Sequence, residues 1–184
     1  MDGPPFNDDI LGSPGNDMKF EKIGFDESTG RELYYVFLRS TEELSTIASF
    51  PDGYFVLLFL NYSADFNTDS IAEAARRFTE NGLAYLCAWG NRCEQIHDIF
   101  DEAICSGFPN ETDDKVIMTT WHRGDSIDDV LWFSIYSTWP ADHYFDWCKK
   151  VLVLNCGDGN LEAHILHRLR DPKKLAAEAC RGIS

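Results

Sequence analysis

Four short apolar runs dominate the pattern of hydrophobic and polar positions from Tyr54 onward. Each run has the length of a strand and lacks regular alternation with polar residues, as is typical of strands covered on both faces. The runs are Tyr54–Leu60, Leu83–Trp89, Lys115–Thr120 and Val151–Leu154. We therefore expect them to form the core of a mainly parallel sheet.

The segments between and after these runs predict helices, because their apolar residues recur at intervals of three and four. Ser70 with Glu73, and Ser126 with Asp129, have the spacing of capping pairs. The second pair opens an apolar helix from Ile127 to about Tyr136, which we expect to be largely buried. The other apolar helical stripes are Ile71, Ala74, Ala75 and Phe78; Cys93, Ile96, Phe100 and Ile104; and Leu161, Ile165 and Leu169.

The first third of the chain has a different pattern. Residues Met1–Asp17 are rich in Pro, Gly, Asp and Asn and predict a flexible tail. Lys19–Phe25 and Glu32–Leu38 flank a turn-rich stretch and predict a hairpin at the edge of the sheet. Thr41–Phe50 predicts a short helix that ends before Pro51.

Strand and helix alternate at least four times from residue 54 onward. This alternation is typical of a three-layer α/β fold around a mainly parallel, doubly wound sheet, Rossmann-like or flavodoxin-like, with the N-terminal hairpin as an edge. A chain of 184 residues has the length of one such domain. We therefore expect residues 1–17 to be a tail and residues 18–184 to form a single α/β domain.

The net charge of −15 excludes generic binding to a phosphate backbone, which depends on Lys and Arg. The charge is uneven, since residues up to Cys148 include 27 acidic and 9 basic residues, whereas 4 acidic and 7 basic residues follow. An acidic surface attracts a basic protein partner and speeds their encounter. It also serves solubility, and the sequence does not separate these two roles.

Several features point to a cytoplasmic protein without a membrane span. The longest apolar run is far shorter than the eighteen or more residues that cross a bilayer, and no secretory signal is visible at the N-terminus. The six cysteines form no C-x-x-C pair, and several lie in apolar runs, so we expect reduced, buried thiols. A zinc site or a disulfide framework is the less favoured alternative.

The candidate site lies where the second and third apolar runs end, because ligands of open α/β sheets bind at the carboxyl ends of the strands. If these strands are adjacent, two indoles, imidazoles and carboxylates converge on one crevice. The predicted ligand-binding residues are Trp89, Gly90, His97, Asp101, Trp121 and His122. His122 and Asp98 are weak candidates for acid–base catalysis, since a carboxylate can orient a histidine that titrates near neutral pH.

The sequence lacks the motifs of the commonest enzymes on this fold. It has no P-loop, nucleophile elbow or metal-binding H-E-x-x-H pattern, so we predict no catalytic motif, no metal and no cofactor. Gly157-Asp-Gly159 offers backbone N–H groups before a helix, but the third glycine of a dinucleotide fingerprint is missing and Asp158 would repel a phosphate. The aromatic residues from Trp139 to Trp147 are expected in the core, with an exposed binding surface as the alternative.

Two strand ends carry a family resemblance. The stretches Ala84–Gly90 (AYLCAWG) and Val116–His122 (VIMTTWH), continued by Ser126–Phe133 (SIDDVLWF), resemble an uncharacterised bacterial protein family, a domain of unknown function with AWG and MTTWH strand ends. The resemblance covers roughly Tyr54 to Trp139. It implies a cytosolic α/β domain and carries no assigned activity.

Two functions are consistent with these observations. The first is an acidic cytosolic interaction protein, of the immunity or regulatory type, that binds a basic protein partner; we prefer it because of the charge and the missing catalytic motifs, and we lean against an enzyme. The second is a small-molecule site, for a nucleotide or a sugar, or a hydrolytic site, around Trp89, Trp121 and His122. Tryptophans beside polar groups suit the stacking of such rings.

Overall fold

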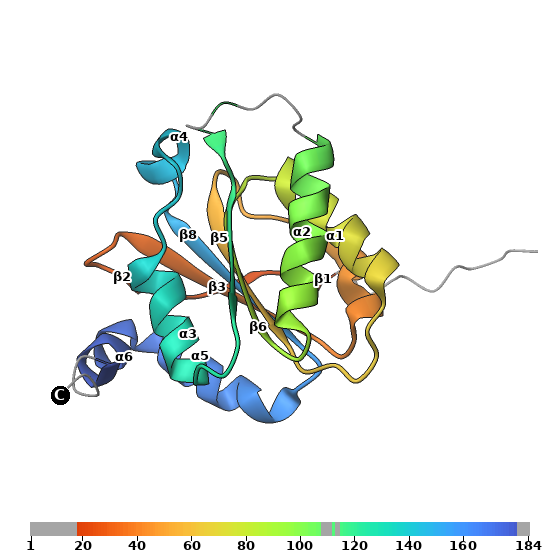
Figure 1. Cartoon of the computed structure of the whole chain (residues 1–184). Helices are drawn as coiled ribbons and strands as arrows, with labels where there is room; N and C mark the ends of the chain where they lie inside the picture. The colour runs from red at the N-terminus through yellow and green to blue at the C-terminus, as the bar shows by residue number, and fades with distance from the viewer. Residues whose placement is uncertain (1–17, 108–111, 113–114, 180–184) are drawn as a thin grey trace, which may run out of the picture.

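A computed structural model describes residues 18–107, 112 and 115–179 of the chain (Figure 1). Its main sheet has six strands in the order β2-β3-β8-β5-β6-β7. All neighbouring strands are parallel except β2 and β3, which form an antiparallel pair. The predicted mixed α/β fold with a mainly parallel sheet is therefore confirmed. The predicted N-terminal tail lies outside the described residues.

The four apolar runs form the central strands, as predicted. They are β5 (Phe55–Asn61), β6 (Leu83–Gly90), β7 (Met118–His122) and β8 (Lys150–Cys156). Every residue of β5 is buried, because helices cover the strand on both faces. The third strand begins three residues later than the predicted run Lys115–Thr120 and continues two residues beyond it, through Trp121 and His122.

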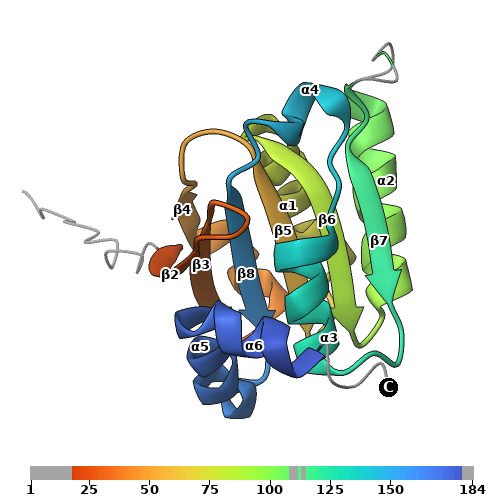
Figure 2. The same cartoon turned by 90° about the vertical axis from the view of Figure 1, so that its left-hand side faces the viewer.

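Helices cover both faces of the sheet (Figures 1 and 2). The helices α1 (Thr68–Glu80) and α2 (Cys93–Gly107) pack together on one face. The opposite face carries α3 (Ile127–Trp132), which continues as the π-helical η3 (Phe133–Ser137), together with α5 (Glu162–Arg170) and α6 (Pro172–Ala179). A short helix, α4 (Asp142–Phe145), lies over the amino-terminal edge of the sheet.

The N-terminal hairpin is confirmed, with β2 (Glu21–Asp26) at the edge and β3 (Arg31–Leu38) beside β8. The helix expected over Thr41–Phe50 is wrong in its second half. A 3₁₀ helix, η1 (Thr41–Thr46), is followed by β4 (Ile47–Ser49), which pairs in parallel with β1 (Met18–Lys19). Ile47 is buried as part of this small two-stranded sheet, which lies outside the main one.

The capping residues agree with the sequence at one helix and not at another. Ser126 and Asp129 form the predicted capping box at the start of α3. At α1, the cap is Asn67, whose side chain accepts a hydrogen bond from the Ser70 N–H, so Ser70 lies inside the helix. Asn and Ser are both common N-cap residues, and Asn67 lies three residues before Ser70. The sequence pattern alone therefore does not show which of the two caps the helix.

Candidate functional site

The strands that carry the predicted site are adjacent. β6 and β7 run in parallel, with Trp89 opposite His122 and Ala88 opposite Trp121. Successive side chains of a strand point to opposite faces of the sheet, so Trp121 and His122 cannot line the same face. The six predicted ligand-binding residues are therefore not gathered into one crevice, but form two groups separated by the sheet.

The first group lies on the α2 side. His97 is packed between two carboxylates, with its Nδ1 3.2 Å from Asp98 and its Nε2 3.5 Å from Asp101. The Thr119 hydroxyl lies 3.0 Å from His97 Nε2 and donates to Asp101 over 2.7 Å. The His97 ring also meets the Trp121 indole edge-on, with ring centroids 4.6 Å apart. At this point α2 therefore contacts β7 through polar side chains and not through apolar packing.

The second group lies on the α3 side. Here His122 packs against Phe133 with ring centroids 4.6 Å apart, and its Nδ1 is 2.9 Å from the Asp125 carboxylate. Trp89 is buried and donates from its indole Nε1 to the Asp125 carbonyl over 2.9 Å. Trp89 therefore has a structural partner and supports the turn that holds Asp125.

Asp125, His122 and Thr120 lie in a line that resembles a catalytic triad in its order of groups. His122 Nε2 is 3.2 Å from the Thr120 hydroxyl, while Nδ1 faces Asp125. The same hydroxyl, however, donates to the Leu86 carbonyl, as a structural threonine does. A nucleophile also needs space for a substrate and donors for an oxyanion. The pocket at this edge of the sheet is lined by other residues, which are Gly90, Arg92, Cys93, Glu94, Gln95, Asp98 and Arg123.

That pocket has a volume of about 390 Å³ and lies where α2 begins. Its two arginines and two carboxylates give it no preference for a ligand of either sign. Arg92 has a φ of 56°, a left-handed conformation that is rare for residues with a side chain. Its guanidinium lies 4.8 Å from the centre of the Phe66 ring. This cation–π contact gives Arg92 a structural partner.

The topological switch of the sheet, where ligands of this fold class usually bind, lies between β5 and β8. Here the loop that follows β5 contacts the loop that follows β8. The Tyr62 N–H donates to the Cys156 carbonyl over 2.7 Å. Gly157 has a φ of +96°, and a Cβ on it would lie 2.3 Å from the Ser63 nitrogen. The switch is therefore filled by the protein's own backbone.

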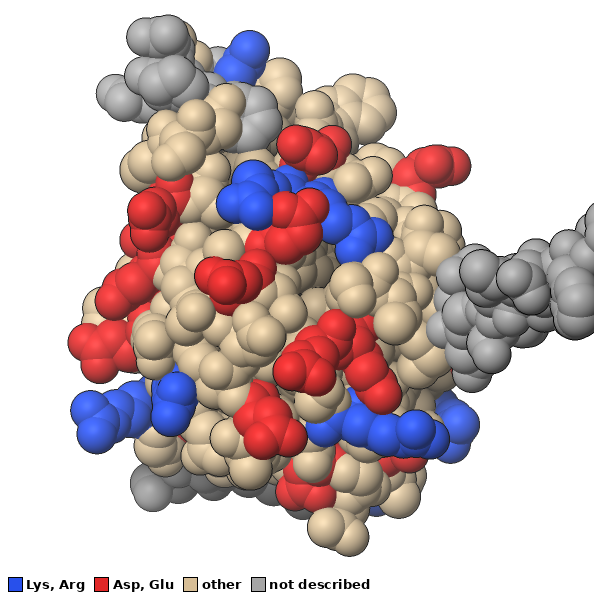
Figure 3. Space-filling view, turned by 90° about the vertical axis from the view of Figure 1, so that its right-hand side faces the viewer, with Lys and Arg blue, Asp and Glu red and all other residues tan. Residues whose placement is uncertain are grey.

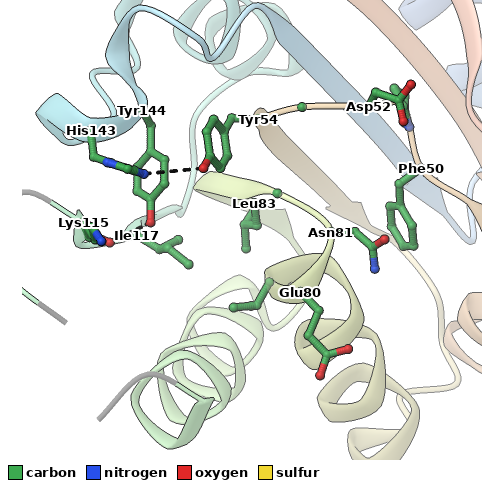
Figure 4. Close-up of a pocket in the computed structure, with 14 residues that line it drawn as sticks. Phe50, Asp52, Tyr54, Glu80, Asn81, Leu83, Lys115, Ile117, His143 and Tyr144 are labelled. Carbon is green, nitrogen blue, oxygen red and sulfur yellow. Dashed lines mark hydrogen bonds between the residues drawn. The ribbon is translucent and has the colours of Figure 1, made fainter. Parts of the chain in front are cut away.

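A larger pocket, which the sequence did not predict, lies at the opposite, amino-terminal edge of the strands (Figure 4). It has a volume of about 620 Å³. On one side the Tyr54 hydroxyl faces the His143 ring, 3.5 Å from Nε2, and Tyr144 donates to the Lys115 carbonyl. Phe50 lines the other side. Residues from four segments that are distant in the sequence meet here, which no local motif could reveal.

The thiols near the sheet are poor nucleophiles. Burial raises the pKa of Cys87 to about 12, although the Thr120 hydroxyl and Arg31 act in the opposite direction. Burial also raises the pKa of Cys156 to about 12. Such thiols stay protonated at neutral pH and behave as small apolar side chains, as predicted. Cys105, in contrast, is exposed.

The outer face of α2 is acidic. Glu94, Asp98 and Glu102 stand at intervals of four residues and are exposed, and Asp101 lies beside them. The helix contains no Lys or Arg. Acidic side chains accordingly run down the margin of the molecule on the α2 side (Figure 3). Trp121, which contacts His97 of this helix, is 47% exposed. We call α2 and Trp121 together the acidic face.

A second exposed surface corrects the expectation that the aromatic residues after η3 belong to the core. Tyr144 is buried, but Trp139 and Trp147 are 67% and 73% exposed. Trp139 and Phe145 stack on each other with ring centroids 5.4 Å apart. A helix of four residues has only one turn, so it can bury one aromatic residue while its neighbours face solvent.

Two properties of the described residues bear on membranes and metals. None of the described helices combines the length and apolarity that a bilayer span requires. Nor do the residues with described positions include three or more His, Cys, Asp or Glu side chains grouped as metal ligands would be.

These features define a class: an α/β domain whose usual ligand crevice is filled by its own loops, and whose distinctive surfaces are an acidic helix and exposed aromatic rings. The model of a family described as "Domain of unknown function (DUF7684)" matches residues 33–172, which is more than half of the chain. The chain belongs to this family, and the expectation of an uncharacterised family is confirmed. None of the curated proteins matches the chain.

Proposed function

We propose that this protein is an acidic interaction protein, of the immunity or regulatory type, that binds a basic protein partner through the acidic face. The observation that carries the proposal is the row of exposed carboxylates on α2, a helix without Lys or Arg; Arg92 and Arg123 lie beside Glu94 and Asp98 at the start of the helix. A surplus of charge of one sign speeds encounter with a partner of the opposite sign and fixes its orientation.

The exposed aromatic residues add a source of affinity. Charged side chains at the rim of an interface mainly change association rates, whereas buried aromatic residues provide most of the binding energy. Trp121 is the natural anchor, because it contacts His97, which lies between Asp98 and Asp101, and is half exposed. Trp139 and Phe145 offer a further aromatic contact at the amino-terminal edge of the sheet.

The experiment is an affinity purification that compares three forms of the full chain. The first is the natural chain, and the second carries Glu94→Gln, Asp98→Asn and Glu102→Gln. The third is a control that loses the same number of exposed carboxylates elsewhere, at Glu21, Glu80 and Asp142. Proteins retained by each form are identified by mass spectrometry, and the dissociation constant of each is measured with purified components.

We expect a strongly basic protein to be retained by the natural chain and by the control, and to be lost from the α2 variant. Its dissociation constant should also rise at least tenfold between about 50 mM and about 500 mM salt, because salt screens exposed charges. A partner that binds the α2 variant and the control equally well, or with the same affinity at both salt concentrations, would remove the basis of the proposal.

A hydrolytic or small-molecule site is the second candidate, and the alignment of Asp125, His122 and Thr120 is the observation in its favour. Its test is a panel of nucleotides, sugars and activated esters against the natural chain and His122→Gln. A ligand that binds only the folded chain raises its melting temperature. A melting temperature and an ester turnover that are the same for both proteins across the panel would exclude this candidate.

Three finer expectations belong to this proposal. They are a Rossmann-like or flavodoxin-like winding, a bacterial source, and a cytoplasmic location. The family resemblance supports the last two, and the parallel order of β3, β8, β5, β6 and β7 supports the first.

A further inference from the structure

Among the residues that the structure describes, β7 forms one edge of the main sheet. β7 is the last strand of the main sheet, and in Figure 2 no strand lies beyond it. As in any edge strand, alternate backbone N–H and C=O groups of β7 point away from β6 and have no ladder partner. Such an edge can pair with another strand, so folded proteins usually protect it.

The other edge of the same sheet shows this protection. β2 carries the charged residues Glu21 and Lys22 and an irregular register between Lys22 and Gly24. The helix α5 covers it so closely that a Cβ on Gly24 would lie 2.0 Å from the Leu169 carbonyl oxygen. Charge, irregularity and coverage by a helix are the devices that block strand pairing.

β7 carries less of this protection over its described residues, although α2 packs against it, the strand has only five residues, and Lys115 and Arg123 flank it. The stretch Val116–Trp121 contains no charged residue and no proline, and its register with β6 is regular. Val116 and Met118 are exposed, at 42% and 40%, as is Trp121. The β7 edge is therefore the less protected of the two and the more open to a further strand.

The surroundings of β7 decide what kind of strand it can accept. On the α2 side, Thr119 donates to Asp101, and Trp121 contacts His97, whose ring nitrogens lie near Asp98 and Asp101. A second copy of this chain would bring an identical acidic helix toward the first, and like charges at that distance repel. A basic segment meets complementary charge there, and its lysines can also lie over the Trp121 indole.

We propose that an extended, basic segment of the partner protein adds to the sheet as a strand along β7. This mode of binding rests on the proposed function, because it supposes that the partner is basic. Side chains of the added strand alternate between two faces. Basic residues would face Asp101 and Trp121, and apolar residues would cover Met118 and Thr120 on the other face. The recognised pattern is therefore an alternation of basic and apolar residues.

The test uses two synthetic peptides of about nine residues in which lysine and valine alternate. The second peptide has the same sequence, but its valine and lysine backbone amides are N-methylated, which leaves the charge unchanged and removes the donors of both edges of the strand. Binding of each peptide to the full chain is measured by calorimetry. Amide exchange of β7 is followed by NMR, with and without peptide, in the natural chain and in the Glu94→Gln, Asp98→Asn, Glu102→Gln variant.

We expect the unmodified peptide to bind at least tenfold more tightly than the methylated one, since several backbone hydrogen bonds depend on the missing donors. Exchange at alternate amides of β7 should slow at least tenfold when it binds. The α2 variant should weaken both peptides, which tests the proposed function separately.

Three results would overturn the strand-addition mode. Equal binding of both peptides without protection of β7 would leave an acidic binding surface but no added strand. No binding of either peptide at about 50 mM salt would exclude the addition of a basic strand at this edge. The proposed function would then still be tested by the affinity purification, which asks whether a basic protein binds the acidic face at all. Protection of β7 that grows with protein concentration in the absence of peptide would assign the edge to a second copy of the chain.

Discussion

Replacement of Arg31 by Met tests how the chain holds the end of its π-helical turn. Arg31 is 8% exposed, and its guanidinium donates to the carbonyls of Ser134, Ile135 and Thr138 and to the Thr138 hydroxyl. The last carbonyls of a helix lack partners within it, and a cation there also meets the negative end of the helix dipole. Burial lowers the pKa of Arg31, yet a guanidinium stays charged at neutral pH.

The expected loss of stability follows from the groups that would be left without a partner. The Ser134 carbonyl keeps a hydrogen bond from the Thr138 hydroxyl, but the carbonyls of Ile135 and Thr138 lose the Arg31 donors. Each buried acceptor without a donor costs about 1–3 kcal/mol. The variant no longer buries a charge, which offsets part of this cost. We therefore expect Arg31→Met to lower the free energy of unfolding by about 2–4 kcal/mol.

The free energy of unfolding is measured by urea titration with tryptophan fluorescence. Arg31→Lys keeps the charge but loses the fork of donors, so about half of the effect should remain. The control is Lys22→Met, which removes an exposed cation paired with Glu32 and should cost less than about 1 kcal/mol. If Arg31→Met costs no more than Lys22→Met, the cap does not stabilise the turn and our account of this helix end is wrong.

Four further outcomes follow from the structure. Asp26 is buried, which raises its pKa, but its hydrogen bonds outweigh burial and the net pKa is lowered. Asp26→Asn should therefore cost about 1.5–3 kcal/mol of unfolding free energy at pH 7, and the difference should vanish in acid as pH falls from the ordinary carboxyl pKa through the lowered one. Gly157→Ala should lower the free energy of unfolding, measured by urea titration, by about 1–3 kcal/mol or more, because Gly157 has a positive φ and a Cβ there would contact the Ser63 backbone. A thiol reagent followed by peptide mapping should label Cys105 and leave Cys87 unmodified in the native chain. Trp147→Ser should change stability by less than about 0.5 kcal/mol, since the indole is mostly exposed.

The sequence predicted those parts of the fold that depend on local patterns. The continuous apolar runs indicated β5, β6 and β8 because a strand buried on both faces admits few polar residues. The predicted site required the second and third apolar strands to be adjacent, and β6 and β7 are indeed paired. These features are properties of single segments, so they can be read without knowledge of distant contacts.

The candidate site depended on a finer detail that local patterns do not determine. Trp121 and His122 belong to β7 and not to a turn, and neighbours in a strand face opposite sides. Because Trp121 and His122 are neighbours in one strand, the sheet separates His97 and Trp121 on one face from Trp89 and His122 on the other. The exposure of Trp147 was missed for a related reason, because an aromatic residue in a one-turn helix can face either way.

The uneven distribution of charge along the chain becomes an uneven distribution in space. Two of the seven basic residues that follow Cys148 form ion pairs where the chain folds back. Arg168 forms ion pairs with Asp128 and Glu178, and Lys173 pairs with Glu27. These contacts neutralise acidic residues on the α3 side of the sheet and close its β2 edge.

On the opposite side, Arg92 and Arg123 lie beside Glu94 and Asp98 at the start of α2, and the helix itself contains no Lys or Arg. The acidic row of α2 and the edge strand β7 therefore occur together, at the end of the sheet that the C-terminal helices do not cover. Solubility alone would account for the charge but not for an edge strand without charge or proline. A partner that supplies both basic residues and a strand accounts for the two features at once.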